Sequence, residues 1–65
     1  MKKVVIENWR EYGDYMLYAN VVSDLKLGII LQVDASGLSA FGDKDRVQRF
    51  EKELRNRVGS NIVIK

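Results

Sequence analysis

The stretch Asp43–Val58, which reads DKDRVQRFEKELRNRV, gives the clearest structural signal in this chain of 65 residues. Its apolar residues recur at spacings of three and four, which places them along one stripe of an α-helix: Val47, Phe50, Leu54 and Val58. Asp43 can cap the first turn with its carboxylate, and Gly59 is a natural end. We therefore expect an amphipathic helix from about Asp43 to Val58, with one face buried.

A β-hairpin is expected immediately before this helix. The apolar runs Leu27–Val33 and Leu38–Phe41 are separated by Asp34–Gly37, which reads DASG. The glycine can adopt the left-handed conformation that a type I turn with a bulge requires, and the aspartate carboxylate can bond the turn backbone. Because successive residues of a strand point to opposite faces, Ile30 is expected on the back of its strand.

The first third of the chain is open to two interpretations. Lys3–Trp9 and Tyr15–Val22 both have the composition of strands. A rival interpretation makes Ile6–Ala19 a helix, but Gly13 in its interior would cost about 1 kcal/mol, so we favour the strands. After the main helix, the β-branched segment Asn61–Ile64 predicts a final strand.

These elements predict a single α+β domain over residues 1–65. The expected order is about ββββαβ, a small antiparallel sheet with one amphipathic helix packed on one face. The composition, 46% hydrophobic and 31% charged, is typical of a globular chain. There is no apolar run of about 18 residues that would suggest a membrane span. The absence of cysteine fits a reducing compartment, so we expect a cytoplasmic protein.

One helix can cover only one face of the expected sheet. The apolar residues expected on the other face are Trp9, Met16, Tyr18 and Ile30. An exposed apolar patch larger than about a few hundred Å² usually marks an interaction surface. We therefore expect a binding or regulatory protein that acts through protein–protein contacts, with a homodimer through this face as the leading arrangement. In the rival interpretation the first hairpin folds over its own back face and leaves no patch.

Catalytic chemistry has few candidates in this sequence. The chain contains no histidine and no cysteine, which removes the usual general base, the thiolate nucleophile and the commonest metal ligands. Helix capping explains Asp43 and Asp45, and the serines have no histidine to activate them. Neither the dinucleotide-binding nor the P-loop glycine pattern is present. We expect no enzymatic activity, no cofactor and no metal site.

The charge distribution leaves nucleic-acid binding as an alternative function. The formal net charge is only +2, from 11 basic and 9 acidic residues. A nucleic-acid surface would need cations beside aromatic side chains on which bases can stack. The candidate cations are Arg10, Arg46, Arg49 and Arg57. Because acidic residues interrupt the basic helix face, this alternative ranks below protein–protein contact.

The segment Leu38–Arg55, which reads LSAFGDKDRVQRFEKELR, resembles the strand-then-helix unit of acylphosphatase-like, ferredoxin-type domains. It covers about a quarter of the chain, and its pattern is shared by any strand that precedes an amphipathic helix. The acylphosphatase phosphate loop with its arginine is absent, and we expect no helix in the first half of the chain. The resemblance therefore implies a type of fold and carries no activity.

Overall fold

The computed structural model describes all 65 residues and contains three strands and two α-helices. The elements in chain order are β1 (Lys2–Ile6), the short 3-10 helix η1 (Trp9–Glu11), α1 (Tyr15–Asp24), β2 (Ile30–Asp34), β3 (Gly37–Gly42) and α2 (Lys44–Val58). The α+β class and the antiparallel sheet are confirmed. The predicted order ββββαβ is wrong, because the sheet has fewer strands and the first half of the chain contains a helix.

β3 is the central strand of a sheet whose order is β1-β3-β2. Both pairings are antiparallel, and Ala40 lies opposite Val4 on one side and Leu31 on the other. β1, α1 and β2 form a β-α-β unit whose two strands are separated in the sheet by β3. This split arrangement is that of ferredoxin-type folds.

The carboxyl-terminal segment lies along the free edge of β1. Ile64 forms an isolated antiparallel bridge with Ile6. Val5 and Lys65 exchange two backbone hydrogen bonds, of 3.3 and 2.9 Å. The predicted final strand at Asn61–Ile64 is thus reduced to a single bridge, although the segment does return to the sheet.

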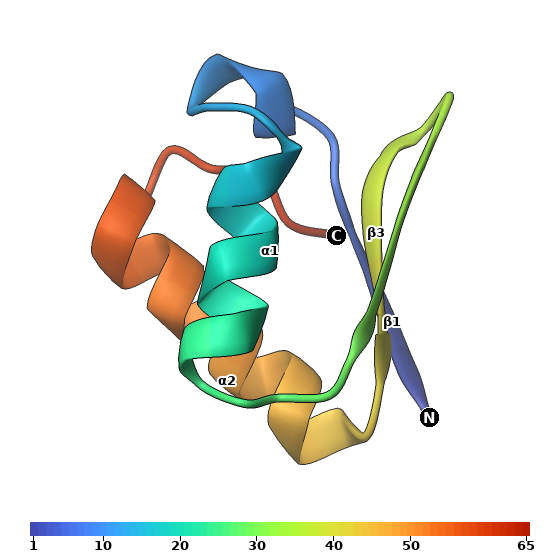
Figure 1. Ribbon diagram of the computed structural model, residues 1–65. Helices are drawn as coiled ribbons and strands as arrows, with labels where there is room; N and C mark the ends of the chain where they lie inside the picture. The colour runs from blue at the N-terminus through green and yellow to red at the C-terminus, as the bar shows by residue number, and fades with distance from the viewer.

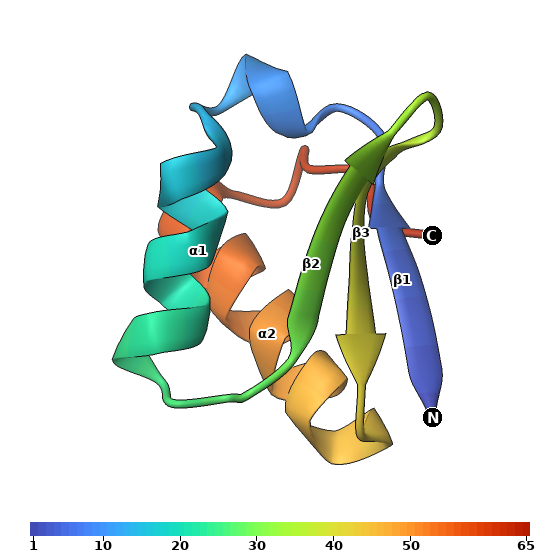
Figure 2. The same ribbon diagram turned by 45° about the vertical axis from the view of Figure 1, so that its right-hand side comes forward.

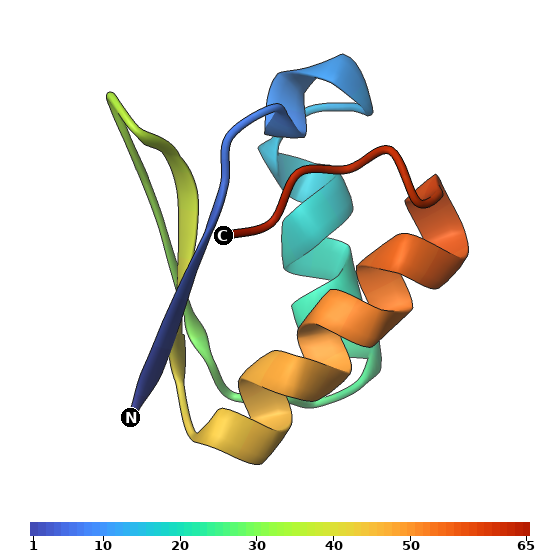
Figure 3. The same ribbon diagram turned by 180° about the vertical axis from the view of Figure 1, so that it is seen from behind.

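Both helices lie on the same side of the sheet, and no element covers the other side (Figures 1 and 3). α2 packs against β1, β3 and α1. The core between the two layers consists of buried apolar side chains from every part of the chain: Val4, Ile6, Trp9, Tyr18, Val21, Leu27, Ile29, Leu38, Ala40, Val47, Phe50, Leu54 and Ile62. The two-layer arrangement leaves one sheet face without a partner.

α1 replaces the strand that we expected over Tyr15–Val22. Its start is fixed by Asp14, whose carboxylate accepts a hydrogen bond of 3.0 Å from the backbone N–H of Met16. Tyr18 and Val21, three residues apart, are buried on the core side of the helix. Packing of this stripe overrides the strand preference of the β-branched residues. The rival helix over Ile6–Ala19 is also wrong, because the helix starts after Gly13.

The end of α1 is a Schellman motif. The N–H of Leu27 bonds the carbonyl of Val22 at 3.0 Å, and the N–H of Lys26 bonds the carbonyl of Ser23 at 3.1 Å. Lys26 has a φ of 52° and is the only residue other than glycine with a positive φ. The chain then turns from the helix toward β2.

The hairpin and the second helix confirm the sequence expectations. Asp34 pairs with Gly37 across a tight turn, and Gly37 has a φ of 134°. α2 starts after Asp43, whose carboxylate accepts a hydrogen bond from the N–H of Asp45, and it ends at Gly59. Neither helix is long and apolar enough to cross a membrane.

Candidate protein-contact surface

The side of the sheet away from the helices forms a continuous surface, called the outer face below. Val4, Ile6 and Leu38 point into the core, so the residues between them point outward. The outer face consists of Lys3 and Val5 on β1, Glu7 just after this strand, Ser39 and Phe41 on β3, Ile30 and Gln32 on β2, and Lys65 beside Val5. Both helices lie on the opposite side of the sheet from this face (Figure 2).

An apolar row crosses one end of the outer face. Phe41 on the central strand lies opposite Lys3 of β1 and opposite Ile30 of β2. The Ile30 side chain is 62% exposed, although it is one of the large apolar residues of the sheet. The Lys3 ammonium lies 5.2 Å from the centre of the Phe41 ring. This distance is that of a cation–π contact, so the lysine flanks the apolar row without covering Ile30.

The opposite end of the outer face is acidic. Gly37, four residues before Phe41 on β3, lies between Glu7 and Asp34. Glu7 forms an ion pair of 3.0 Å with Lys65, in which both side chains are largely exposed. The outer face thus has a basic residue at one end and two carboxylates at the other.

The acidic end is held by a rigid turn. Asp34 accepts hydrogen bonds from the hydroxyl of Ser36 at 2.5 Å and from its backbone N–H at 2.9 Å. These bonds lower the pKa of Asp34, because they stabilise the ionised carboxylate. A Cβ atom at Gly37 would lie 2.5 Å from the carbonyl oxygen of Ile6, so only glycine fits between the turn and β1.

Ser39 lies at the centre of the outer face and is fully buried by its neighbours. Its hydroxyl oxygen has no hydrogen-bond partner. It lies opposite Val5 on β1 and Gln32 on β2. A buried hydroxyl without a partner is energetically unfavourable. Ser39 is therefore held by the packing of the residues around it and not by a hydrogen bond of its side chain.

The free edge of β2 adjoins the outer face. No backbone hydrogen bond outside the ladder with β3 reaches residues 30–34. On the helix side, Leu31 is half-buried and Val33 is 41% exposed, because α2 covers the other two strands. The strand contains no proline or lysine of the kind that protects sheet edges. The exposed apolar surface of the sheet is therefore concentrated on and beside β2.

The structure does not bring the four predicted contact residues together. Trp9 and Tyr18 are buried in the core, where the Tyr18 hydroxyl bonds the Trp9 carbonyl. Met16 is 56% exposed but lies on α1, on the helix side. Ile30 alone occupies the outer face. Met16 and Tyr18 are not on the sheet because residues 15–24 form a helix, and Trp9 is not because β1 ends at Ile6 and Trp9 belongs to η1.

The predicted cations are also divided between different parts of the molecule. Arg46, Arg49 and Arg57 lie along α2, and Arg46 reaches the carbonyl of Leu27 at 3.3 Å. Arg10 belongs to η1, before the start of α1, and its guanidinium lies 5.0 Å from the Trp9 ring centre. The three arginines of α2 lie on the helix side of the sheet, whereas Arg10 lines a cleft together with Glu7 and Asp34.

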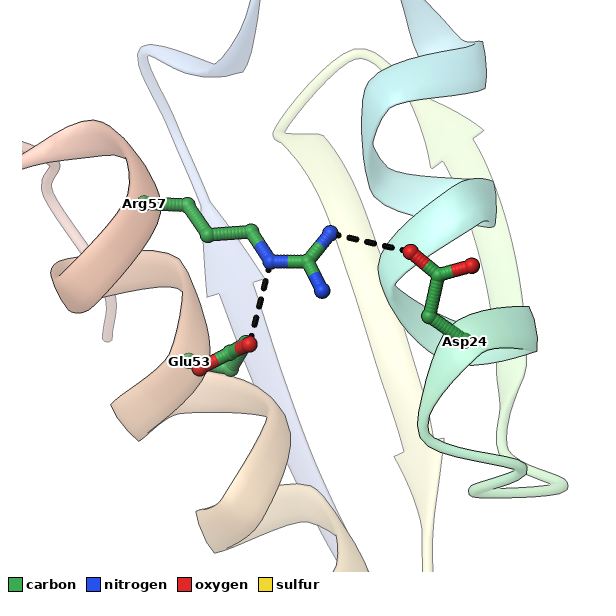
Figure 4. A network of polar contacts seen from close by, with 3 residues as sticks. All are labelled: Asp24, Glu53 and Arg57. Carbon is green, nitrogen blue, oxygen red and sulfur yellow. Dashed lines mark hydrogen bonds and ion pairs between the residues drawn. The ribbon is translucent and has the colours of Figure 1, made fainter.

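Arg57 is engaged within the protein. Its guanidinium forms ion pairs of 3.1 Å with Asp24 at the end of α1 and of 3.0 Å with Glu53 one turn earlier on α2 (Figure 4). The hydrogen bonds to Asp24 and to Glu53 raise the pKa of Arg57. The side chain therefore links the two helices, and its charge is largely compensated.

A cleft of about 550 Å³ opens between the hairpin tip and the connection from β1 to η1. Its lining is mostly polar: Glu7, Asn8, Trp9, Arg10, Glu11, Asp34, Ala35 and Gly37. No group of three or more carboxylates in the chain is placed to hold a metal ion. The cleft offers charges and hydrogen-bonding groups, but no pairing of a nucleophile with a base.

Comparison with known proteins does not assign this chain to a family. No family model, no curated protein and no solved structure gives a match.

All residues of the outer face except Ile30 were missing from the predicted contact residues, among them Lys3, Val5 and Phe41. Phe41 could have been placed from the sequence. In the expected strand Leu38–Phe41, the apolar Leu38 points to the core, so alternation places Phe41 on the opposite face. Placing Lys3 and Val5 required knowledge that β1 pairs with β3, which is a contact between segments far apart in the sequence.

Proposed function

We propose that this chain is a non-enzymatic binding or regulatory protein that acts through protein–protein contacts and self-associates through its outer face. We further infer that it works in the cytoplasm, since a chain without cysteine does not depend on an oxidising compartment. The observation that carries the proposal is the exposed Ile30 beside Phe41 on a sheet face that no helix covers.

Size supports the same conclusion. A chain of 65 residues has a thin core, and covering its open sheet face would bury additional apolar surface. Two-fold homodimers are the commonest assemblies of proteins that associate with themselves. A second copy offers the same apolar and charged residues, so apolar side chains can meet apolar ones and charged groups of opposite sign can pair across the contact.

The proposal is tested by sedimentation velocity over a range of concentrations, with wild type, Ile30→Asp and Met16→Asp. Ile30→Asp introduces a carboxylate into the apolar row and is expected to weaken the dimer at least about tenfold. Met16 is similarly exposed but lies on α1, so Met16→Asp is the matched control and should dimerise like wild type. A dimer that both variants weaken equally, or that neither weakens, contradicts a contact through the outer face.

Single-stranded nucleic acid is a second candidate ligand for the same surface. It is favoured by the Phe41 ring, which lies next to the Lys3 ammonium on a sheet face where a base could stack. Fluorescence anisotropy with labelled oligonucleotides at low salt tests it. Affinity that decreases steeply with added salt and is lost in Phe41→Ala would support this function, and the absence of binding at low salt would remove it.

A further inference from the structure

The two edges of the sheet differ in how the chain covers them. β1 lies at one edge and β2 at the other. The carboxyl-terminal segment covers the edge of β1, where Val5 exchanges two backbone hydrogen bonds with Lys65 and Glu7 donates one to the carbonyl of Val63. No segment of the chain forms backbone hydrogen bonds with the outer edge of β2. The sheet therefore has one covered edge and one free edge (Figure 2).

The bonds of Val5 determine which backbone groups of β2 are free. In an antiparallel sheet, successive residues of a strand direct their N–H and C=O groups alternately to the two sides. Because Val5 bonds the carboxyl-terminal segment, the residue before it bonds β3 at Ala40. On β3 the preceding residue, Ser39, then bonds β2 at Gln32. The residues on either side of Gln32 therefore direct their N–H and C=O groups away from the sheet.

Three residues form a row of free backbone groups along this edge: Ile29, Leu31 and Val33. Leu31 and Val33 are the residues that flank Gln32. Ile29 directly precedes the strand, and neither its N–H nor its C=O forms a backbone hydrogen bond, although the residue is only 8% exposed. Backbone groups beside a core are nearly always paired, so this row lacks a partner strand.

We propose that a second copy of the chain binds this edge, so that the two β2 strands pair antiparallel about a two-fold axis at Leu31. Leu31 of each copy then exchanges two hydrogen bonds with Leu31 of the other, and Val33 exchanges two with Ile29. Every free group of the row is paired, and the two sheets become one continuous sheet. This contact is separate from the contact through the outer face, and either can form without the other.

The side chains of the paired residues are compatible on both sides of the joined sheet. On the helix side, Leu31 meets Leu31 and Val33 meets Ile29, so the pairs are entirely apolar. Val33, which is 41% exposed in the single chain, becomes covered. On the other side, the exposed Ile30 lies beside Gln32 of the second copy.

Charge favours the axis at Leu31. Asp34 is the only charged residue of β2. This axis places it opposite Gly28 of the second copy and separates the two Asp34 carboxylates by about 20 Å, well beyond the screening length of about 8 Å. The guanidinium of Arg46 lies beside Gly28, with Nη1 3.4 Å from the position of a Cβ atom, so the neighbouring charge is positive.

A second copy also closes the assembly. Its free edge has the same three residues at the same spacing, so the two rows match in length and in their donors and acceptors. After pairing, both remaining edges are those of β1, which the carboxyl-terminal segments cover. No free edge is left, so the assembly stops at two copies.

Hydrogen exchange of the backbone amides tests this pairing directly. In a single copy the N–H groups of Leu31 and Val33 have no partner and exchange rapidly, whereas pairing protects them. Exchange is measured by NMR from dilute to concentrated protein. Both amides should exchange about tenfold more slowly once nine-tenths of the chains are paired. Ser60, an exposed residue whose N–H also has no bond, is the reference and should keep one rate.

Two lysine variants provide the matched comparison. Val33→Lys places an ammonium beside Ile29 of the second copy and should weaken pairing at least about tenfold, which removes the protection of Leu31. Val63→Lys makes the same change at a valine of similar exposure, 39%, on the covered edge and should keep that protection. Circular dichroism verifies that both variants fold.

The exchange data separate edge pairing from contact through the outer face. A dimer in sedimentation whose Leu31 and Val33 amides exchange at one rate at every concentration overturns the edge pairing and leaves the outer-face contact standing. A chain that stays monomeric at every concentration overturns both. Protection that Val33→Lys retains, or that Val63→Lys removes to the same extent, also overturns the edge pairing.

Discussion

The hydroxyl of Tyr18 donates a hydrogen bond of 2.5 Å to the backbone carbonyl of Trp9. The two rings also meet edge to face, with centroids 6.1 Å apart and planes at 80°. Since Tyr18 lies on α1 and Trp9 on η1, this contact fixes the start of the helix against the segment that follows β1. It explains why two aromatic residues that are plausible contact residues in the sequence serve the core instead.

Replacing Tyr18 with phenylalanine removes the hydrogen bond and keeps the ring. The Trp9 carbonyl then keeps only the longer bond of 3.3 Å from the backbone N–H of Tyr12, so the free energy of unfolding should fall by about 1 kcal/mol. Urea denaturation measures the change. Tyr15→Phe, which alters an exposed tyrosine of the same helix, should leave stability unchanged within about 0.5 kcal/mol. Equal stability of wild type and Tyr18→Phe would contradict the role of the bond.

Alkaline pH should destabilise the protein through the same residue. Burial, with a smaller contribution from the charge of Tyr12, raises the pKa of Tyr18 from 10.0 to about 12. Between these values the unfolded chain loses the phenolic proton while the folded chain keeps it, so the free energy of unfolding falls as pH rises. The loss attributable to Tyr18 approaches about 2–3 kcal/mol at pH 12. Stability curves of wild type and Tyr18→Phe should converge above pH 10, and parallel curves would contradict the shift.

Lys26→Gly should stabilise the chain. Lys26 adopts the left-handed conformation at the end of α1, makes no ion pair and is exposed. Glycine adopts this conformation without the steric cost of a Cβ atom, so the free energy of unfolding should rise by about 1 kcal/mol. Lys26→Ala keeps the Cβ atom and is the control, with no comparable gain. A loss of stability in Lys26→Gly would show that the lysine contributes more than its backbone geometry.

Ser39→Ala removes the unpaired hydroxyl at the centre of the outer face. Because the hydroxyl has no partner, its removal should leave stability unchanged or raise it by up to about 1 kcal/mol. Ser36→Ala, which deletes a hydroxyl bonded to Asp34, should instead lower stability slightly. Thermal unfolding of both variants provides the comparison. A clear loss of stability in Ser39→Ala would mean that its hydroxyl is bonded after all.

Local patterns predicted the second half of the fold. The stripe of α2, its capping by Asp43 and the turn at Asp34–Gly37 each depend on residues close in sequence, and all three are present in the structure. In the first half the same kind of signal was ambiguous. Tyr15–Val22 contains only one strongly polar residue, Asn20, so alternation and helical spacing both fit its pattern, and the capping carboxylate of Asp14 is the local feature that favours a helix.

The contact surface was predicted only in outline. An uncovered sheet face follows from having too few helices to cover two faces, and the structure retains that face even with a second helix, because both helices lie on one side. The members of the face follow from the pairing of β1 with β3. That pairing joins segments more than 30 residues apart and leaves no mark in a single sequence.

The most direct measurement of the central claim is a dilution series followed by heteronuclear NMR. Self-association through the outer face predicts that the amide signals of Val5, Gln32 and Phe41 shift with concentration while those of Met16 and Asn20 on α1 stay fixed. Signals that do not move at any concentration, or that move only on the helices, would contradict it.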